Sequence, residues 1–71
     1  MIVNIYIDNA TSDEVMDYVT NGLGWMGLDN PIVERYDVDG SAELVCEFRG
    51  KEYLDEFIWQ LESAGYDVDY N

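Results

Sequence analysis

The sequence predicts an α+β domain in which two helices cover one face of a four-stranded antiparallel sheet. Three observations support this. Apolar residues alternate with polar ones in several short segments, recur at helical spacing in two longer segments, and are interrupted by turn residues between them. With 48% hydrophobic residues and no linker or repeat, residues 1–71 are expected to form one globular domain.

The first expected elements are a strand and an amphipathic helix. Residues 2–7 alternate, which predicts a strand. Thr11 and Glu14 have the spacing of a capping box, in which each side chain bonds the other residue's backbone N–H. The helical stripe that follows comprises Val15, Tyr18, Val19 and Gly22. Residues 21–31 contain three glycines and a proline, so they are expected to end the helix and form a loop.

Residues 32–50 are expected to form a β-hairpin, and two registers are open. A two-residue turn at Asp39 and Gly40 would place Tyr36 opposite Glu43 and mix core and surface residues on each face. A three-residue loop over 38–40 would instead pair Asp37 with Ser41. Since register follows the side that must be buried, we predict the three-residue loop. Its core side comprises Ile32, Tyr36, Ala42, Leu44, Cys46 and Phe48, together with Glu34, which favours a position at the sheet edge.

Residues 51–65 predict the second helix, and residues 66–70 the last strand. The helix carries an apolar stripe and ends at Gly65. The stripe comprises Leu54, Phe57, Ile58 and Leu61. In the last strand Tyr66, Val68 and Tyr70 are expected to point inward. The resulting element order, βαββαβ, resembles the ferredoxin-like split βαβ pattern.

Charge is the extreme property of this chain. Sixteen Asp and Glu stand against Arg35, Arg49 and Lys51, for a net charge of −13. This exceeds the magnitude of about 2–8 that keeps a small domain soluble. Long-range repulsion disfavours direct binding to nucleic acid or to an anionic membrane, whereas a basic protein partner is favoured.

The sequence offers little for catalysis. It has no histidine, and its single cysteine, Cys46, is expected to be a buried, inert thiol. We therefore predict no enzyme, no cofactor and no metal site. With one cysteine, no signal-peptide pattern and no apolar run approaching 18 residues, a cytoplasmic location is expected.

Two groups of residues are candidates for partner binding. Trp59 falls opposite the apolar stripe of its helix, among Glu52, Asp55 and Glu56. It is either a partner hot spot, or a contact with the loop or with a second copy of the chain. The uncovered sheet face is expected to carry further candidates: Tyr6, Asp37, Glu43, Glu47, Asp67 and Asp69. On the same face Val33 and Arg35 are expected, with Arg35 opposite Glu43. Trp25 and Met26, in the glycine-rich loop, form a second apolar candidate patch.

In size, acidity and compactness the chain resembles the small phage-encoded inhibitors of bacterial defence, the anti-CRISPR and anti-restriction proteins, several of which imitate DNA. The resemblance implies a non-enzymatic inhibitor that binds a basic, nucleic-acid-binding surface of a host protein complex, in the host cytoplasm. One alternative is a small structural or regulatory ferredoxin-like domain that acts through homodimerisation. A second alternative, ranked lower, is divalent-cation binding by the acidic clusters.

Overall fold

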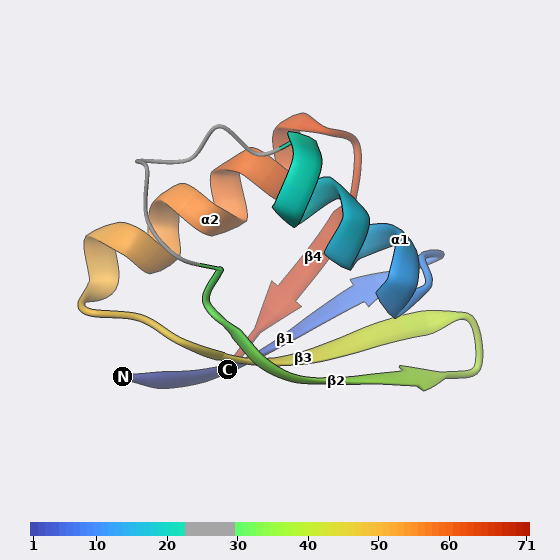
Figure 1. Cartoon of the computed structure of the whole chain (residues 1–71), viewed down its shortest axis with the longest axis horizontal. Coiled ribbons are helices and arrows are strands. Elements are labelled where there is room, and N and C mark those ends of the chain that lie inside the picture. The colour runs from blue at the N-terminus through green and yellow to red at the C-terminus, as the bar shows by residue number, and fades with distance from the viewer. Residues whose placement is uncertain (23–29) are drawn as a thin grey trace.

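The computed structural model describes residues 1–22 and 30–71, and its element order agrees with the prediction. The elements are β1 (Ile2–Asp8), α1 (Ser12–Asp17), the π-helical turn η1 (Tyr18–Gly22), β2 (Ile32–Val38), β3 (Ser41–Glu47), α2 (Lys51–Ser63) and β4 (Asp67–Tyr70) (Figure 1). Trp25 and Met26 lie outside the described residues.

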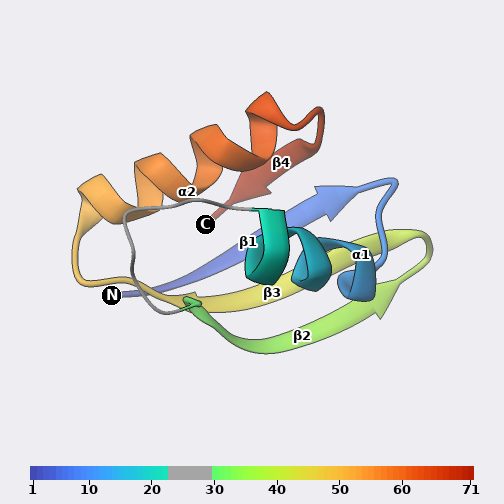
Figure 2. The same ribbon diagram turned by 45° about the horizontal axis from the view of Figure 1, so that its top comes forward.

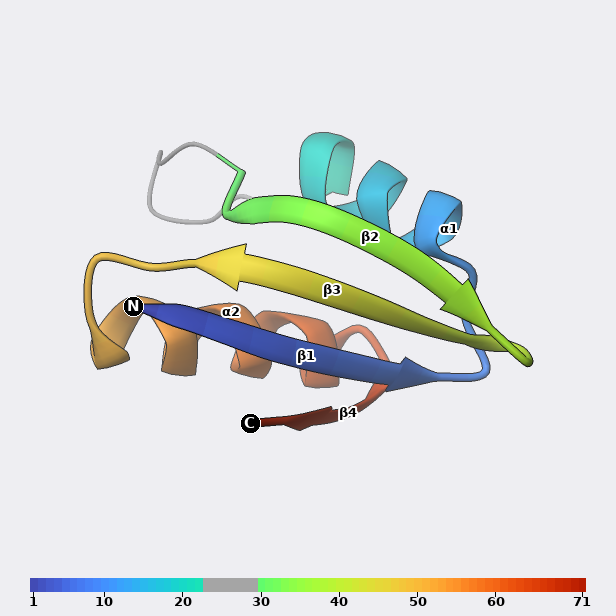
Figure 3. The same cartoon turned by 90° about the horizontal axis from the view of Figure 1, so that it is seen from below.

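The four strands form one antiparallel sheet in the order β2-β3-β1-β4. Both helices lie on the same face of it, α1 over β2 and β3 and α2 beside β4 (Figures 2 and 3). No helix of residues 1–22 and 30–71 covers the second face (Figure 3), which we call the open face. The predicted α+β architecture, with two helices on one face of a four-stranded antiparallel sheet, is confirmed.

The core lies between the sheet and the two helices. The predicted stripe of α2 is buried, and the α2 residue Phe57 packs against Phe48 with ring centroids 5.5 Å apart. The buried apolar side chains are Val3, Ile5, Ile7, Ala10, Val15, Val19, Ala42, Leu44, Cys46, Phe48, Leu54, Phe57, Ile58 and Leu61. On β4, Tyr66 and Val68 pack partly against this core, while Tyr70 stays 45% exposed because β4 is an edge strand.

The hairpin has the two-residue turn, so the prediction of a three-residue loop is wrong. Val38 pairs with Ser41, and Asp39 and Gly40 both have positive φ (48° and 83°), as a type I′ turn requires. A bulge at Val33 then brings Ile32 opposite Cys46. Burial could not select the register because Val33–Val38 of this edge strand are all exposed.

This register exchanges the two sides of β2. Tyr36 lies opposite Glu43 and is 50% exposed on the open face, where Glu34 also lies, so neither belongs to the core side. Arg35 and Asp37 lie opposite Leu44 and Ala42, on the side that the helices cover. The expected Arg35–Glu43 pair and the expected placement of Asp37 on the open face are therefore wrong.

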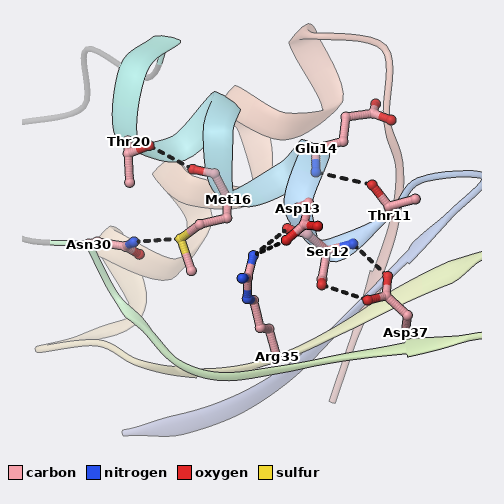
Figure 4. Close-up of polar contacts among 9 residues, drawn as sticks. All are labelled: Thr11, Ser12, Asp13, Glu14, Met16, Thr20, Asn30, Arg35 and Asp37. Atoms are coloured by element: carbon pink, nitrogen blue, oxygen red, sulfur yellow. Dashed lines mark hydrogen bonds and ion pairs between the residues drawn. The ribbon is translucent and has the colours of Figure 1, made fainter.

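The two displaced charges anchor the start of α1 instead (Figure 4). The Ser12 backbone N–H and hydroxyl each donate a hydrogen bond of 2.7 Å to the Asp37 carboxylate. Arg35 forms an ion pair of 2.9 Å with Asp13. Thr11 Oγ1 accepts the Glu14 N–H at 3.1 Å, which is one of the two bonds of the predicted capping box. Side chains of β2 thus complete the cap of α1.

We expect the Asp37 contact to give a pH-dependent stability. The bonds from the Ser12 N–H and hydroxyl lower the pKa of Asp37 below its ordinary value of 3.8. The stabilisation is therefore complete above that ordinary value and is lost as pH falls through the lowered pKa. Asp37→Asn should reduce Tm at pH 7, and its difference from wild type should narrow below about pH 4, as measured by thermal melts.

Asp67→Asn is the matched control, because it removes the same charge from a residue that lies opposite Asp8. Facing like charges destabilise a sheet, so this variant should be at least as stable as wild type at pH 7. A Tm difference for Asp37→Asn that stays constant from pH 7 to about pH 3 would contradict the assigned contact.

Candidate partner-binding surfaces

The predicted partner-binding residues divide between two opposite surfaces. Trp59, Glu52, Asp55 and Glu56 lie on the outer side of α2, which we call the Trp59 surface. Tyr6, Glu43, Glu47, Asp67 and Asp69 lie on the open face. Asp37 belongs to neither, since it caps α1. The structure therefore brings together each group but not the whole set.

The open face is consistently acidic. The register aligns one row of side chains across all four strands, Tyr36–Glu43–Tyr6–Asp69. Beside this row Val38 pairs with Ser41 and Asp8 with Asp67, and the Ser41 hydroxyl donates a hydrogen bond of 3.1 Å to the Asp8 carboxylate. Strand alternation adds Glu34, opposite Val45, and Glu47, opposite Ile2, to the same face. The carboxylates there are Asp8, Glu34, Glu43, Glu47, Asp67 and Asp69. Among the strand residues that the structure describes on this face, none is a lysine or an arginine.

Two of the three basic side chains in the sequence form ion pairs away from the open face. Arg35 pairs with Asp13 of α1, and Lys51 pairs with Asp55 of α2 at 3.1 Å. Exposed pairs of this kind contribute little to stability. Their consequence here is electrostatic, because the two cations compensate acids on the helical side and leave the carboxylates of the open face uncompensated by them.

The open face also contains a hollow of about 210 Å³ between two tyrosines. Its lining residues are Asn4, Tyr6, Tyr36, Glu43, Leu44 and Val45, and we call it the tyrosine hollow. The Tyr36 hydroxyl donates a hydrogen bond to the Glu34 carboxylate, which raises the pKa of Tyr36. Sequence reasoning missed the second tyrosine of this hollow because it assigned Tyr36 to the core. The Asp39-Gly40 pair, a strong signal for a two-residue turn, could have revealed it.

Trp59 is 59% exposed, so the expected outward orientation is confirmed, while its role stays a prediction. It lies opposite the buried stripe of α2, as the helical spacing predicted. The neighbouring carboxylates are partly engaged: Asp55 pairs with Lys51, and Glu56 accepts a hydrogen bond of 3.1 Å from Gln60. The indole of Trp59 is thus an exposed apolar group surrounded by acidic side chains on the outer side of α2.

The chemistry of the described residues agrees with a structural role for Cys46. Its side chain is fully buried, and burial raises the pKa of the thiol to about 12, which suppresses the nucleophilic thiolate. Across residues 1–22 and 30–71, no three His, Cys, Asp or Glu side chains group in a way that could hold a metal ion. Neither helix of the described chain has the length and apolarity required to span a membrane.

We expect the uncompensated acids to make stability depend on salt. A net charge of −13 on 71 residues repels itself in the compact state, and salt screens this repulsion, with a Debye length of about 10 Å at 0.1 M. The urea midpoint should therefore be higher at about 0.3 M NaCl than at about 0.01 M. An unchanged or lower midpoint would show that the acids are locally compensated.

The scan against protein-family models matches no family, and the searches of curated proteins and of solved structures return no significant match.

Proposed function

We propose that the protein is a non-enzymatic inhibitor, of the anti-CRISPR or anti-restriction type, that binds a basic, nucleic-acid-binding surface of a host protein complex in the host cytoplasm. The observation that carries the proposal is the open face, where six carboxylates occupy strand positions and none of the described strand positions is basic. Such a surface presents negative charge to a protein groove that normally receives phosphates.

The spacing of these carboxylates supports the proposal. Residues two apart on a strand are separated by about 6.6 Å, and neighbouring strands by about 4.8 Å, so the carboxylates occupy points of a regular grid, with uncharged side chains at other points. The phosphates of a duplex are likewise regularly spaced charges. The Cα trace extends 30 × 22 × 17 Å, and a protein of this size would enter a channel that encloses nucleic acid as one compact body. The walls of such a channel would contact both the open face and the Trp59 surface.

The scaffold that we propose for this function is the ferredoxin-like fold. The strand order β2-β3-β1-β4, with each connection through a helix crossing the same face, supports this finer assignment. The fold alone does not indicate function, so the functional proposal depends on the surface chemistry.

Capture from a nuclease-treated bacterial lysate tests the function. The tagged protein should retain nucleic-acid-binding proteins, and added duplex DNA should release them because both compete for one surface. A variant with Glu34→Gln, Glu43→Gln and Asp69→Asn should retain less. The matched control removes three charges elsewhere, by Asp17→Asn, Asp39→Asn and Glu62→Gln, and should retain nearly as much. Capture that duplex DNA does not displace, or no capture of nucleic-acid-binding proteins, would contradict the proposal.

Homodimerisation is the second candidate function, and exposed apolar side chains favour it. Ile2 is 62% exposed, and Val33 and Val38, on the edge strand β2, are 59% and 47% exposed. Against it stands the repulsion between two chains of charge −13. Sedimentation velocity over a range of protein concentrations, at low and moderate salt, separates the two candidates. A concentration-dependent dimer that persists at low salt would favour the second.

A further inference from the structure

The tyrosine hollow has features that distinguish it from the rest of the acidic open face. Tyr6 and Tyr36 lie on either side of Glu43 in one row across β1, β3 and β2. Neighbouring strands are about 4.8 Å apart, so the backbones of the two tyrosines are separated by about 9.6 Å. A flat group can therefore enter between the two side chains, above the strand that carries Glu43 and Val45.

Hydrogen bonds orient both phenol rings. The Tyr36 hydroxyl donates to Glu34, two residues back on β2, and the Tyr6 hydroxyl accepts a bond of 3.2 Å from the Asn71 side chain. Asn71 is itself held beside Asn4, since its backbone N–H donates to the Asn4 carbonyl at 3.0 Å. Both hydroxyls are thus drawn toward the row that contains Glu34, Val45 and Asn4, and the rings become the two walls of the hollow.

The chemistry of the hollow fits a guanidinium group. Aromatic faces attract cations, and the planar guanidinium stacks on them better than a compact ammonium does. The carboxylate of Glu43, which lines the hollow, can accept two of its N–H groups in a bidentate arrangement. The exposed side of Val45 offers apolar surface to the methylene stem. Arg35, the nearest cation by sequence, is engaged with Asp13 on the opposite side of the sheet.

We propose that the tyrosine hollow binds an arginine side chain of a basic protein segment that docks on the open face, with the guanidinium between Tyr6 and Tyr36 and against Glu43. This inference rests on the proposed function, because it names the residue type of the partner that the acidic face recognises. Charge complementarity provides the overall attraction, and the hollow selects arginine over other cations.

Titration of the isotope-labelled protein with a short peptide of alternating glycine and arginine tests the inference. Chemical shifts should change most at Tyr6, Tyr36 and Glu43. The same peptide with lysine in place of arginine should bind at least about fivefold more weakly, since it keeps the charge but loses the planar group. Replacing arginine by uncharged citrulline should abolish binding. Shift changes centred on Trp59, or equal affinity for the arginine and lysine peptides, would overturn the inference.

Variants provide the second measurement. Glu43→Gln and Tyr36→Ala should each weaken binding of the arginine peptide about tenfold, whereas Glu62→Gln, which removes one charge from α2, should weaken it less than about twofold. If Glu43→Gln and Glu62→Gln weakened peptide binding equally, the attraction would depend only on the net charge of the protein, and the inference would be overturned. If lysate capture remains displaceable by duplex DNA while the peptide binds elsewhere, only the hollow assignment fails. If the hollow binds arginine but no nucleic-acid-binding protein is captured, only the proposed function fails.

Discussion

Phe57→Ala is expected to remove a large share of the free energy of unfolding of the protein. Phe57 is fully buried in α2 and packs on Phe48, so truncation would leave a large cavity and cost about 3–5 kcal/mol. A domain of this length has a total unfolding free energy of only about 4–11 kcal/mol, from about 0.05–0.15 kcal/mol per residue. Far-UV circular dichroism and urea titration would show a strongly reduced midpoint or no folded baseline.

The conservative change Phe57→Leu separates cavity formation from a general intolerance of this position. It keeps most of the apolar volume, so the protein should remain folded and lose less than Phe57→Ala. A urea midpoint for Phe57→Ala close to that of wild type would mean that the ring does not fill the core between α2 and the sheet.

Trp59→Ala is expected to have the opposite profile, although it lies only two residues further along α2. Because the indole is 59% exposed, its removal should change stability by less than about 1 kcal/mol. As an aromatic anchor on the partner, it should contribute to binding instead. Affinity for a partner recovered by capture should fall by about 2 kcal/mol or more, about 30-fold, as measured by calorimetry.

Charge reversal around Trp59 is a control with a different kinetic signature. Changing Glu52, Asp55 and Glu56 to Lys should slow association and alter its salt dependence, whereas Trp59→Ala should mainly speed dissociation. A Trp59→Ala variant that unfolds would contradict the exposed position of the indole. Unchanged affinity in a folded variant would remove Trp59 from the partner-binding residues.

Periodicity predicted the elements well because burial determines them. The stripe of α2 and the alternation of β1 are each buried on one side, so the sequence pattern and the packing agree. Cys46 was placed in the core for the same reason. These apolar side chains are stable only in the core, so the local sequence pattern is enough to predict that they are buried.

The register of the hairpin could not be obtained this way. The edge strand β2 buries little apolar surface, so the two registers differ little in the free energy gained by burial. The geometry of the turn decided the pairing instead. The bulge at Val33 then absorbed the mismatch. The role of Asp37 depends on Ser12, 25 positions earlier, and no local pattern reports such a contact.

The candidate surfaces were predicted in part. Trp59 and its acidic neighbours follow from helical spacing alone, and the acids of β3 and β4 follow from strand alternation. The tyrosine hollow needed the correct pairing of Tyr36 with Glu43, which in turn needed the turn type. The sequence therefore predicts which residues are buried better than it predicts which residues lie next to one another on an exposed face.

The buried thiol allows the opening of the central sheet to be measured by chemical labelling. Cys46 lies on β3, between β1 and β2, and it is the single cysteine in the sequence. A thiol reagent can react with it only in molecules whose core has opened. When closing is faster than reaction, the labelling rate divided by that of a free thiol equals the equilibrium fraction of open molecules. Mass spectrometry of the labelled chain can thus report, at neutral pH and without denaturant, the fraction of molecules in which β3 is separated from its helical cover.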